Sequence, residues 1–199
     1  ASTRQTAAAS RGTELYRRYG SWAVVTGASD GIGRELAIRA AELGLNVVIA
    51  ARRADRLDTL AVDLRDRFGV EVLVQATDLA DAAQVEALVG ATRQLDIGLV
   101  ALAAGFGTSG EFLQTARQEE LSMIDVNVRA VGALAHHYAP RLVARGRGGI
   151  VLMGSLVGFQ GVPRAANYAA TKAYVQTLGE GLRAELGPRG VDVVVSAPG

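Results

Sequence analysis

Residues 22–33 read WAVVTGASDGIG, a short apolar run that is followed by three glycines. Residues 34–43 then have the apolar spacing of an amphipathic helix. Glycines at such a joint let the main chain approach a pyrophosphate, and the helix N-terminus stabilises its charge. The stretch therefore predicts a strand, a dinucleotide-binding loop and a helix. A glycine-rich turn without a ligand is the alternative, and a Walker loop is excluded because no Gly-Lys-Ser/Thr follows.

Apolar runs alternate with helical patterns along the rest of the chain. Further strands are expected at 46–50, 70–75, 97–101, 149–153 and 191–195, and helices at 55–68, 80–92, 117–144 and 168–186. Pro140 is expected to kink or interrupt the helix over 117–144. The alternation predicts an α/β fold: a Rossmann-type, doubly wound parallel sheet between two helical layers. Residues 1–20 are expected to form a loosely held N-terminal arm with a helical turn over 14–19, and 21–199 one catalytic domain.

Composition excludes several classes of protein and site. The 199 residues are 49% hydrophobic, which is enough for a large core, and a net charge of +1 offers no basic field for nucleic acid. No cysteine is present, and the adjacent His136 and His137 cannot chelate one metal together, so no metal site is expected. No apolar run reaches the roughly 18 residues that span a bilayer, and no signal peptide is recognisable. We therefore expect a cytoplasmic protein, and the abundance of Arg and Ala suggests a bacterial one.

Lys172 is the only lysine among 21 basic residues, and it follows Tyr168 by four positions in a helical stretch. Both side chains should therefore lie on one helix face. A free phenol ionises near pH 10, too high for ready proton exchange at neutrality, and a nearby ammonium favours the phenolate. The pair predicts acid–base catalysis. A solvated lysine beside a core tyrosine is the alternative.

Together these motifs resemble the short-chain dehydrogenase/reductase family, whose patterns are T-G-x-x-x-G-x-G and Y-x-x-x-K. The resemblance covers 22–199, and residues 19–31 are also similar to the steroid and 3-ketoacyl reductase branch. It implies hydride transfer between a nicotinamide cofactor and a small-molecule ketone or secondary alcohol. It also implies a homodimer or homotetramer that is built through the helices over 117–144 and 168–186.

The resemblance assigns four catalytic residues. Ser155 would orient the substrate carbonyl, Tyr168 would transfer the proton, and Lys172 would tune Tyr168 and hold the nicotinamide ribose. Asn127 would hold a water that relays protons from Lys172. A serine that caps a loop and a buried asparagine bound by the backbone are the alternatives for Ser155 and Asn127.

Cofactor contacts follow from the resemblance in the same way. An NAD enzyme would place an acid after the second strand, whereas this chain has Arg52 and Arg53, which would bind a 2′-phosphate together with Ser29. NADP(H) is therefore favoured over NAD(H). The implied cofactor residues are Gly27, Ser29, Asp30, Gly31, Ile32, Gly33, Arg52, Arg53, Asp78, Leu79, Ala103, Ala104, Gly105, Tyr168, Lys172, Pro198 and Gly199.

Two departures from the family pattern stand out. The family's Asn-Asn-Ala-Gly is replaced by Leu102-Ala103-Ala104-Gly105, so the bracing by the two asparagine side chains is lost. The family's substrate lid and its last helix and strand are not in this chain. Two rival functions remain open: a nucleotide-sugar epimerase or dehydratase, and a non-enzymatic NADP(H) sensor on the same fold. Phe106 and Phe159 suggest a lipophilic pocket, although core packing explains them equally well.

Overall fold

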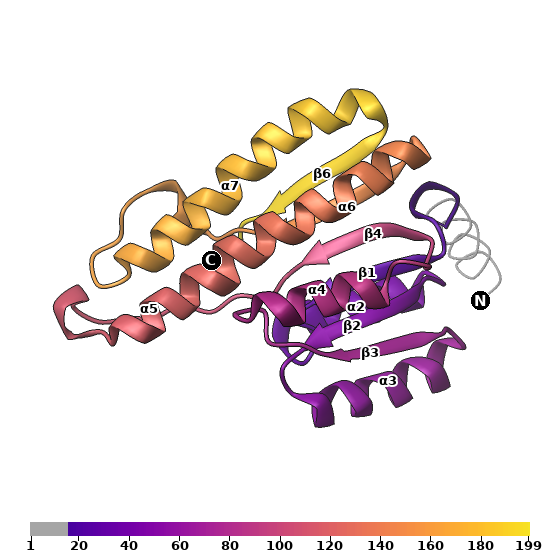
Figure 1. Ribbon diagram of the computed structural model, residues 1–199, viewed down its shortest axis with the longest axis horizontal. Helices are drawn as coiled ribbons and strands as arrows, with labels where there is room; N and C mark the ends of the chain where they lie inside the picture. The colour runs from indigo at the N-terminus through magenta and orange to yellow at the C-terminus, as the bar shows by residue number, and fades with distance from the viewer. Residues whose placement is uncertain (1–15) are drawn as a thin grey trace, which may run out of the picture.

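Six parallel strands form one sheet in the computed structural model, which describes residues 16–199 (Figure 1). The strands are β1 (Trp22–Thr26), β2 (Asn46–Ala51), β3 (Val72–Ala76), β4 (Ile97–Leu102), β5 (Gly148–Met153) and β6 (Val191–Ser196). Their order in the sheet is β3-β2-β1-β4-β5-β6, and every neighbouring pair is parallel. The chain builds outward from β1 to one edge, returns to the centre at β4 and builds to the other edge. The predicted doubly wound parallel sheet is confirmed.

Helices cover both faces of the sheet (Figure 1). They are α2 (Gly31–Glu42), α3 (Ala54–Phe68), α4 (Ala82–Ala91), α5 (Arg117–Ile124), α6 (Val131–Arg145) and α7 (Ala166–Leu186). Leu57 of α3 and Ile38 of α2 belong to the core on one face, and Leu88 of α4, Leu134 of α6 and Val175 of α7 to the core on the other. The three-layer arrangement is therefore confirmed.

The crossing of the chain at β1 and β4 positions the site. In β1 and β4 nearly all side chains are buried, because helices cover both faces of these central strands. Their carboxyl ends, Thr26 and Leu102, are register partners. The loops that follow these two strands therefore leave the sheet side by side, at the switch point where open α/β sheets bind ligands.

The long helical segment after β4 is irregular, but not at Pro140, where the sequence predicts it. Residues Asp125–Ala130 form a π-helical turn between α5 and α6, whereas α6 continues through Pro140 without interruption (Figure 1). Pro140 has no N–H to donate to the carbonyl of His136. Both residues are exposed, so solvent can bind that carbonyl instead. The expected interruption at Pro140 is therefore wrong. The irregular turn lies instead around Asn127, and such π-turns often mark functional sites.

The end of the N-terminal arm is bound to the sheet rather than loosely held. Residues 16–19 are helical, and residues 14 and 15 of the expected turn lie outside the described part. Arg18 donates two hydrogen bonds of 2.7 Å to Asp192 at the start of β6, and the Tyr19 hydroxyl donates a third at 2.8 Å. Gly98 leaves room for the Tyr19 main chain, since a β-carbon there would lie 1.6 Å from the Tyr19 carbonyl oxygen. The expectation of a loose arm is therefore wrong for residues 16–20.

Candidate functional site

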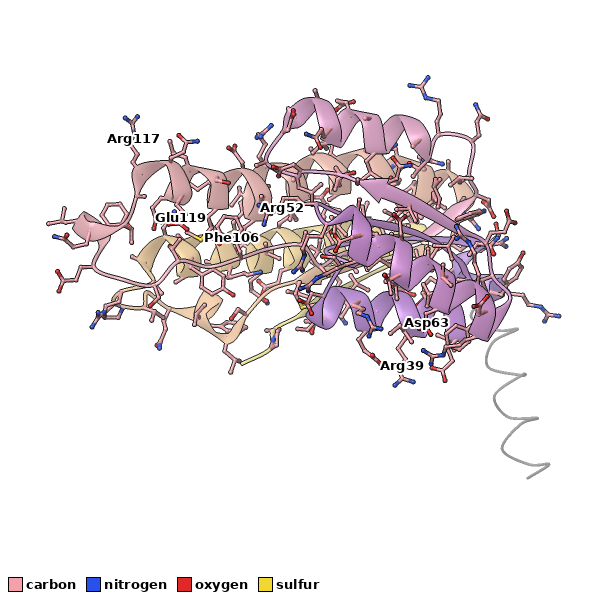
Figure 2. All side chains as sticks on the ribbon, turned by 90° about the horizontal axis from the view of Figure 1, so that it is seen from below. Arg39, Arg52, Asp63, Phe106, Arg117 and Glu119 are labelled. Atoms are coloured by element: carbon pink, nitrogen blue, oxygen red, sulfur yellow. The ribbon has the colours of Figure 1, made fainter. Side chains whose placement is uncertain are left out.

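A cavity of about 560 Å³ opens at the carboxyl ends of β1, β2, β4 and β5. Every residue predicted to contact the cofactor lines it, except Gly199, which lies against Leu156. Figure 2 shows Arg52 and Phe106 toward the middle of the molecule, whereas Arg39 and Asp63 project from its lower surface. Further lining residues, which the sequence did not single out for the cofactor, are Ala51, Thr77, Phe106, Val126, Met153 and Gly154.

The floor of the cavity requires glycine at two positions. A β-carbon on Gly33 would lie 2.4 Å from the carbonyl oxygen of Gly27, and one on Gly27 would lie 2.8 Å from the Ala104 main chain. Both contacts are with backbone, which cannot move aside without displacing the loop. The α2 N-terminus can therefore approach β1 closely. Gly31, Ile32 and Gly33 at this helix end line the cavity, where the helix dipole favours an anion.

Thr26 supports the loop that lacks the family's asparagines. The main-chain N–H of Ala104 donates a 3.2 Å hydrogen bond to the Thr26 hydroxyl oxygen. This bond joins the ends of β1 and β4 where they leave the sheet. A short side chain on β1 thus braces the backbone of Ala103-Ala104-Gly105 although no asparagine side chain is available there.

A cluster of two arginines and two acceptors lies at the β2 end of the cavity. Arg53 donates to the Ser29 hydroxyl at 3.0 Å and to the Asp30 carboxylate at 3.4 Å, and Arg56 donates to the same carboxylate at 2.7 Å. The hydrogen bond from the Gly31 N–H, followed by the charges of Arg56 and Arg53, lowers the pKa of Asp30. Arg56, which the sequence did not single out, lies in the first turn of α3 and does not line the cavity itself; it joins this cluster through Asp30.

Tyr168 and Lys172 lie on consecutive turns at the start of α7, as their spacing predicts. The Lys172 Nζ atom lies 5.7 Å from the centroid of the Tyr168 ring and donates a 2.8 Å hydrogen bond to the Met153 carbonyl. Lys172 is only 5% exposed, and burial lowers its pKa. An ammonium with a lowered pKa, close to a phenol on the wall of a dinucleotide-sized cavity, is an arrangement suited to proton transfer.

Asn127 lies in the π-helical turn and joins the β4 loop to α7. Its amide donates to the Phe106 carbonyl at 2.8 Å and to the Thr171 hydroxyl at 3.1 Å, and its oxygen accepts from the Phe106 N–H at 3.1 Å. Its Oδ1 atom and Lys172 Nζ both flank Gly105, where a β-carbon would lie 3.1 Å and 3.3 Å from them. The Asn127 side chain is thus satisfied by the Phe106 backbone and the Thr171 hydroxyl, while the predicted proton relay stays a prediction.

Ser155 lies two residues beyond the end of β5 and caps a 3₁₀ turn, Leu156–Phe159. Its hydroxyl donates to the Pro198 carbonyl at 3.3 Å and accepts from the Val157 N–H at 3.4 Å. Neither Ser155 nor Asn127 lines the cavity itself, but each adjoins a lining residue, Gly154 and Val126 respectively. The loop-capping alternative therefore describes one contact of Ser155, and its partly exposed hydroxyl remains beside the cavity.

The described residues contain neither a metal-binding cluster nor a membrane-spanning helix. Within residues 16–199, no group of three or more His, Asp or Glu side chains is arranged to hold a metal ion. No helix over the same residues is long and apolar enough to cross a membrane. His136 is exposed on α6, and His137 beside it is partly buried, where burial lowers its pKa.

Comparison with known proteins identifies the family. The family described as short chain dehydrogenase matches residues 21–199. The chain is 35% identical over 182 residues to a 7beta-hydroxysteroid dehydrogenase from Clostridium sardiniense, covering 92% of this chain and 70% of that protein. It is 38% identical over 183 residues to a very-long-chain 3-oxoacyl-CoA reductase from Podospora anserina, covering 89% and 54% of the respective chains.

A solved structure agrees with these relatives. The short-chain dehydrogenase from Sphingobium yanoikuyae in complex with NADPH superposes with a TM-score of 0.84 at 40% identity, covering 88% of this chain and 69% of that one. The family resemblance seen in the sequence is thus confirmed over residues 21–199. We conclude that the chain belongs to the short-chain dehydrogenase family, a family of oxidoreductases.

Proposed function

We propose that the protein is an NADP(H)-dependent oxidoreductase that interconverts a ketone and a secondary alcohol. One observation carries this proposal: Tyr168 and Lys172 line the same cavity as Arg53 and Ser29. Lys172 bonds the last carbonyl of β5, and Arg53 follows the end of β2, with β1 and β4 between these two strands. Three strand spacings amount to roughly 14 Å, so the cavity has the length that an extended dinucleotide needs.

The residues present fit such a cofactor. Gly31 at the N-terminus of α2 lines the cavity, and a β-carbon there would meet nothing within 4 Å, so a pyrophosphate has room to approach the helix. Arg53 and Arg56 converge on Ser29 and Asp30, where an adenine ribose with a 2′-phosphate would place its negative charge. Guanidinium groups bind phosphate through charge-assisted hydrogen bonds, which favours NADP(H) over NAD(H). The NADPH complex of the Sphingobium relative supports the same choice.

The proposed roles follow from position and chemistry. NADPH supplies the hydride when it is bound. Tyr168 donates its phenolic proton to the carbonyl oxygen, so that ketone, hydride and proton together give the alcohol; the reverse reaction returns a proton to the phenolate. Ser155 orients the carbonyl, and Lys172 stabilises the phenolate and holds the ribose. Asn127, next to Lys172 at Gly105, passes the replacement proton through a water.

A lipophilic ketone is the substrate class that we favour. Phe106 lines the cavity, and Leu156 and Phe159, just after Ser155, are 59% and 62% exposed. The relatives from Clostridium and Podospora are named for a hydroxysteroid and a very-long-chain 3-oxoacyl thioester. Both substrates carry a carbonyl or alcohol on a large apolar body, which suits such a surface.

The test is consumption of NADPH by the purified protein with a panel of ketones. Steroid ketones and long-chain 3-oxoacyl thioesters are expected to react faster than small or polar ketones, and Tyr168→Phe is expected to abolish turnover. Tight NADPH binding without consumption for any ketone or alcohol would favour the cofactor sensor instead. Equal rates for wild type and Tyr168→Phe would overturn the catalytic assignment.

A further inference from the structure

The loop after β4 and the first turn of α7 meet at the Tyr168 ring. A β-carbon on Gly107 would lie 2.9 Å from Cδ2 and 3.0 Å from Cγ of Tyr168, so the main chain of Gly107 packs directly on the ring. A shift of this loop relative to α7 would therefore move the phenol. Whatever fixes the two segments to each other determines where the phenol lies.

Glu120, in the first turn of α5, contacts both segments. Thr108 Oγ1 donates a 2.7 Å hydrogen bond to one carboxylate oxygen, and Asn167 Nδ2 donates a 2.7 Å hydrogen bond to the other. Asn167 also donates to the Glu120 carbonyl at 3.1 Å. Thr108 follows Gly107, and Asn167 precedes Tyr168. One carboxylate thus binds the immediate neighbours of the two groups that touch.

The surroundings of Glu120 differ from those of an ordinary surface glutamate. Glu120 is 8% exposed, whereas the adjacent Glu119 is exposed. The hydrogen bonds from Thr108 and then Asn167 outweigh burial and lower the pKa of Glu120, so the side chain is an anion at neutral pH. Two charge-assisted hydrogen bonds on one carboxylate are strong and directional. These bonds fix the positions of Thr108 and Asn167 relative to Glu120. The burial of the carboxylate alone would be weak evidence that Glu120 stabilises the fold.

A second tie joins the same two regions. The Gly110 N–H donates a 2.8 Å hydrogen bond to the carbonyl of Arg164, in the loop before α7. Arg164 has a φ of 65°, a left-handed conformation that is unfavourable for a residue with a side chain. The loop before α7 therefore keeps an unfavourable backbone conformation where it bonds to the loop after β4.

We propose that Glu120 is a positioning residue, which holds the Gly107 loop against α7 and thereby fixes the Tyr168 ring for proton transfer. The proposal rests on the proposed function, because it takes Tyr168 as the group that moves the proton. It is specific to the substrate end of the cavity: Glu120 has no bond to Ser29, Arg53 or Arg56 at the cofactor end among the contacts of residues 16–199.

The first experiment separates turnover from cofactor binding. Glu120→Ala removes both hydrogen bonds and is expected to lower kcat on the order of tenfold to a hundredfold, because small misplacements of reacting groups are costly. The Kd for NADPH should stay within about twofold, which separates positioning from loss of binding. Glu119→Ala is the matched control: it removes the same charge from the same helix turn, and its kcat should equal that of wild type.

A second experiment tests the bond between Glu120 and Asn167. Asn167→Asp sets two carboxylates against each other and should lower kcat strongly. Adding Glu120→Gln should restore most of the loss, because the new amide donates to the new carboxylate and its oxygen still accepts from Thr108. Non-additivity of this kind is the signature of direct coupling. Thr108→Val, which removes one bond only, should lower kcat several-fold and serves if Glu120→Ala does not fold.

The outcomes distinguish this proposal from the proposed function. If Tyr168→Phe turns over as fast as wild type, the proposed function fails whatever Glu120 does. If Tyr168→Phe is inactive but folded Glu120→Ala or Thr108→Val keeps the wild-type kcat, only the role of Glu120 is overturned. A parallel loss of NADPH affinity and kcat, or a double variant no faster than Asn167→Asp, would overturn it as well.

Discussion

Lys172 Nζ donates its 2.8 Å hydrogen bond to the Met153 carbonyl, the last carbonyl of β5, and not to the tyrosine oxygen four residues earlier. The ammonium is thus anchored to the sheet, while the phenol ring is placed by α7 and by Gly107. Two further ammonium protons remain for other acceptors, such as the phenolate and the nicotinamide ribose in the proposed function. A guanidinium could not use this compact anchor in the same way.

The burial of the Lys172 ammonium lowers the stability of the fold by an amount that depends on pH. Burial lowers the pKa of Lys172, so the folded protein binds fewer protons than the unfolded chain between the two pKa values. The penalty is full below the folded pKa and vanishes above the unfolded one, so stability rises with pH across that interval. We expect the unfolding free energy of wild type to rise relative to that of Lys172→Met as the pH rises toward the ordinary lysine pKa of about 10.4. Urea titrations of the two cofactor-free proteins measure this, and a pH-independent difference would contradict it.

Tyr168→Phe should separate chemistry from binding. The ring still packs on Gly107, but no proton can be donated, so kcat should fall on the order of 10²–10⁴-fold. NADPH affinity, measured by fluorescence titration, should remain within about twofold of wild type. A matched control is Tyr174→Phe on the same helix, which is expected to keep the wild-type kcat because Tyr174 lies outside the cavity lining.

Arg52 and Arg53, which line the cavity, should determine the preference for NADPH, together with Arg56, which bonds Asp30 beside them. Each charge-assisted hydrogen bond contributes about 1.5–3 kcal/mol, so Arg53→Ala or Arg56→Ala should weaken NADPH binding by at least about tenfold. NADH affinity should change little, and the NADPH advantage of wild type should shrink as salt rises, because these side chains are about half exposed. Arg39→Ala removes an exposed arginine that pairs with Glu35 and Glu42 away from the cavity, and it should change neither affinity.

The same substitution at two glycines should have opposite effects. Gly33→Ala forces a β-carbon against the Gly27 carbonyl, so it should lower stability and abolish cofactor binding. Gly90→Ala in α4 meets nothing within 4 Å and should raise the unfolding free energy by about 0.4–1 kcal/mol. Thermal unfolding and NADPH titration of both variants test the pair. Wild-type NADPH affinity in Gly33→Ala would disprove the requirement for a bare backbone there.

The sheet and the cofactor loop could be predicted because local sequence determines them. Continuous apolar runs such as 46–50 mark strands covered on both faces, and Gly27 and Gly33 mark the turn between β1 and α2. Residues four apart on a helix must share a face, which is why Tyr168 and Lys172 could be paired before their contacts were known.

Contacts between distant segments were not readable in the same way. The link from Thr26 to Ala104 spans 78 residues, and the ties of Glu120 join three separate segments, so no spacing in the sequence signals them. Pro140 was a misleading signal, because its exposed position on α6 lets the helix tolerate a missing donor. The π-helical turn at Asn127 depends on the fit of α5 and α6 to the sheet, which local propensity does not describe.

The bond between Arg18 and Asp192 joins residues 174 positions apart in the chain. Such a contact closes a very long loop, whose entropic cost must be met before the contact can form. Strand β6, at one end of the six-strand order, is therefore tied to the segment that precedes β1. This tie makes the two βαβ halves interdependent in folding. The bond can form only after both halves, from residue 18 to residue 192, have reached their places in the sheet. Topologies dominated by such distant pairings fold slowly.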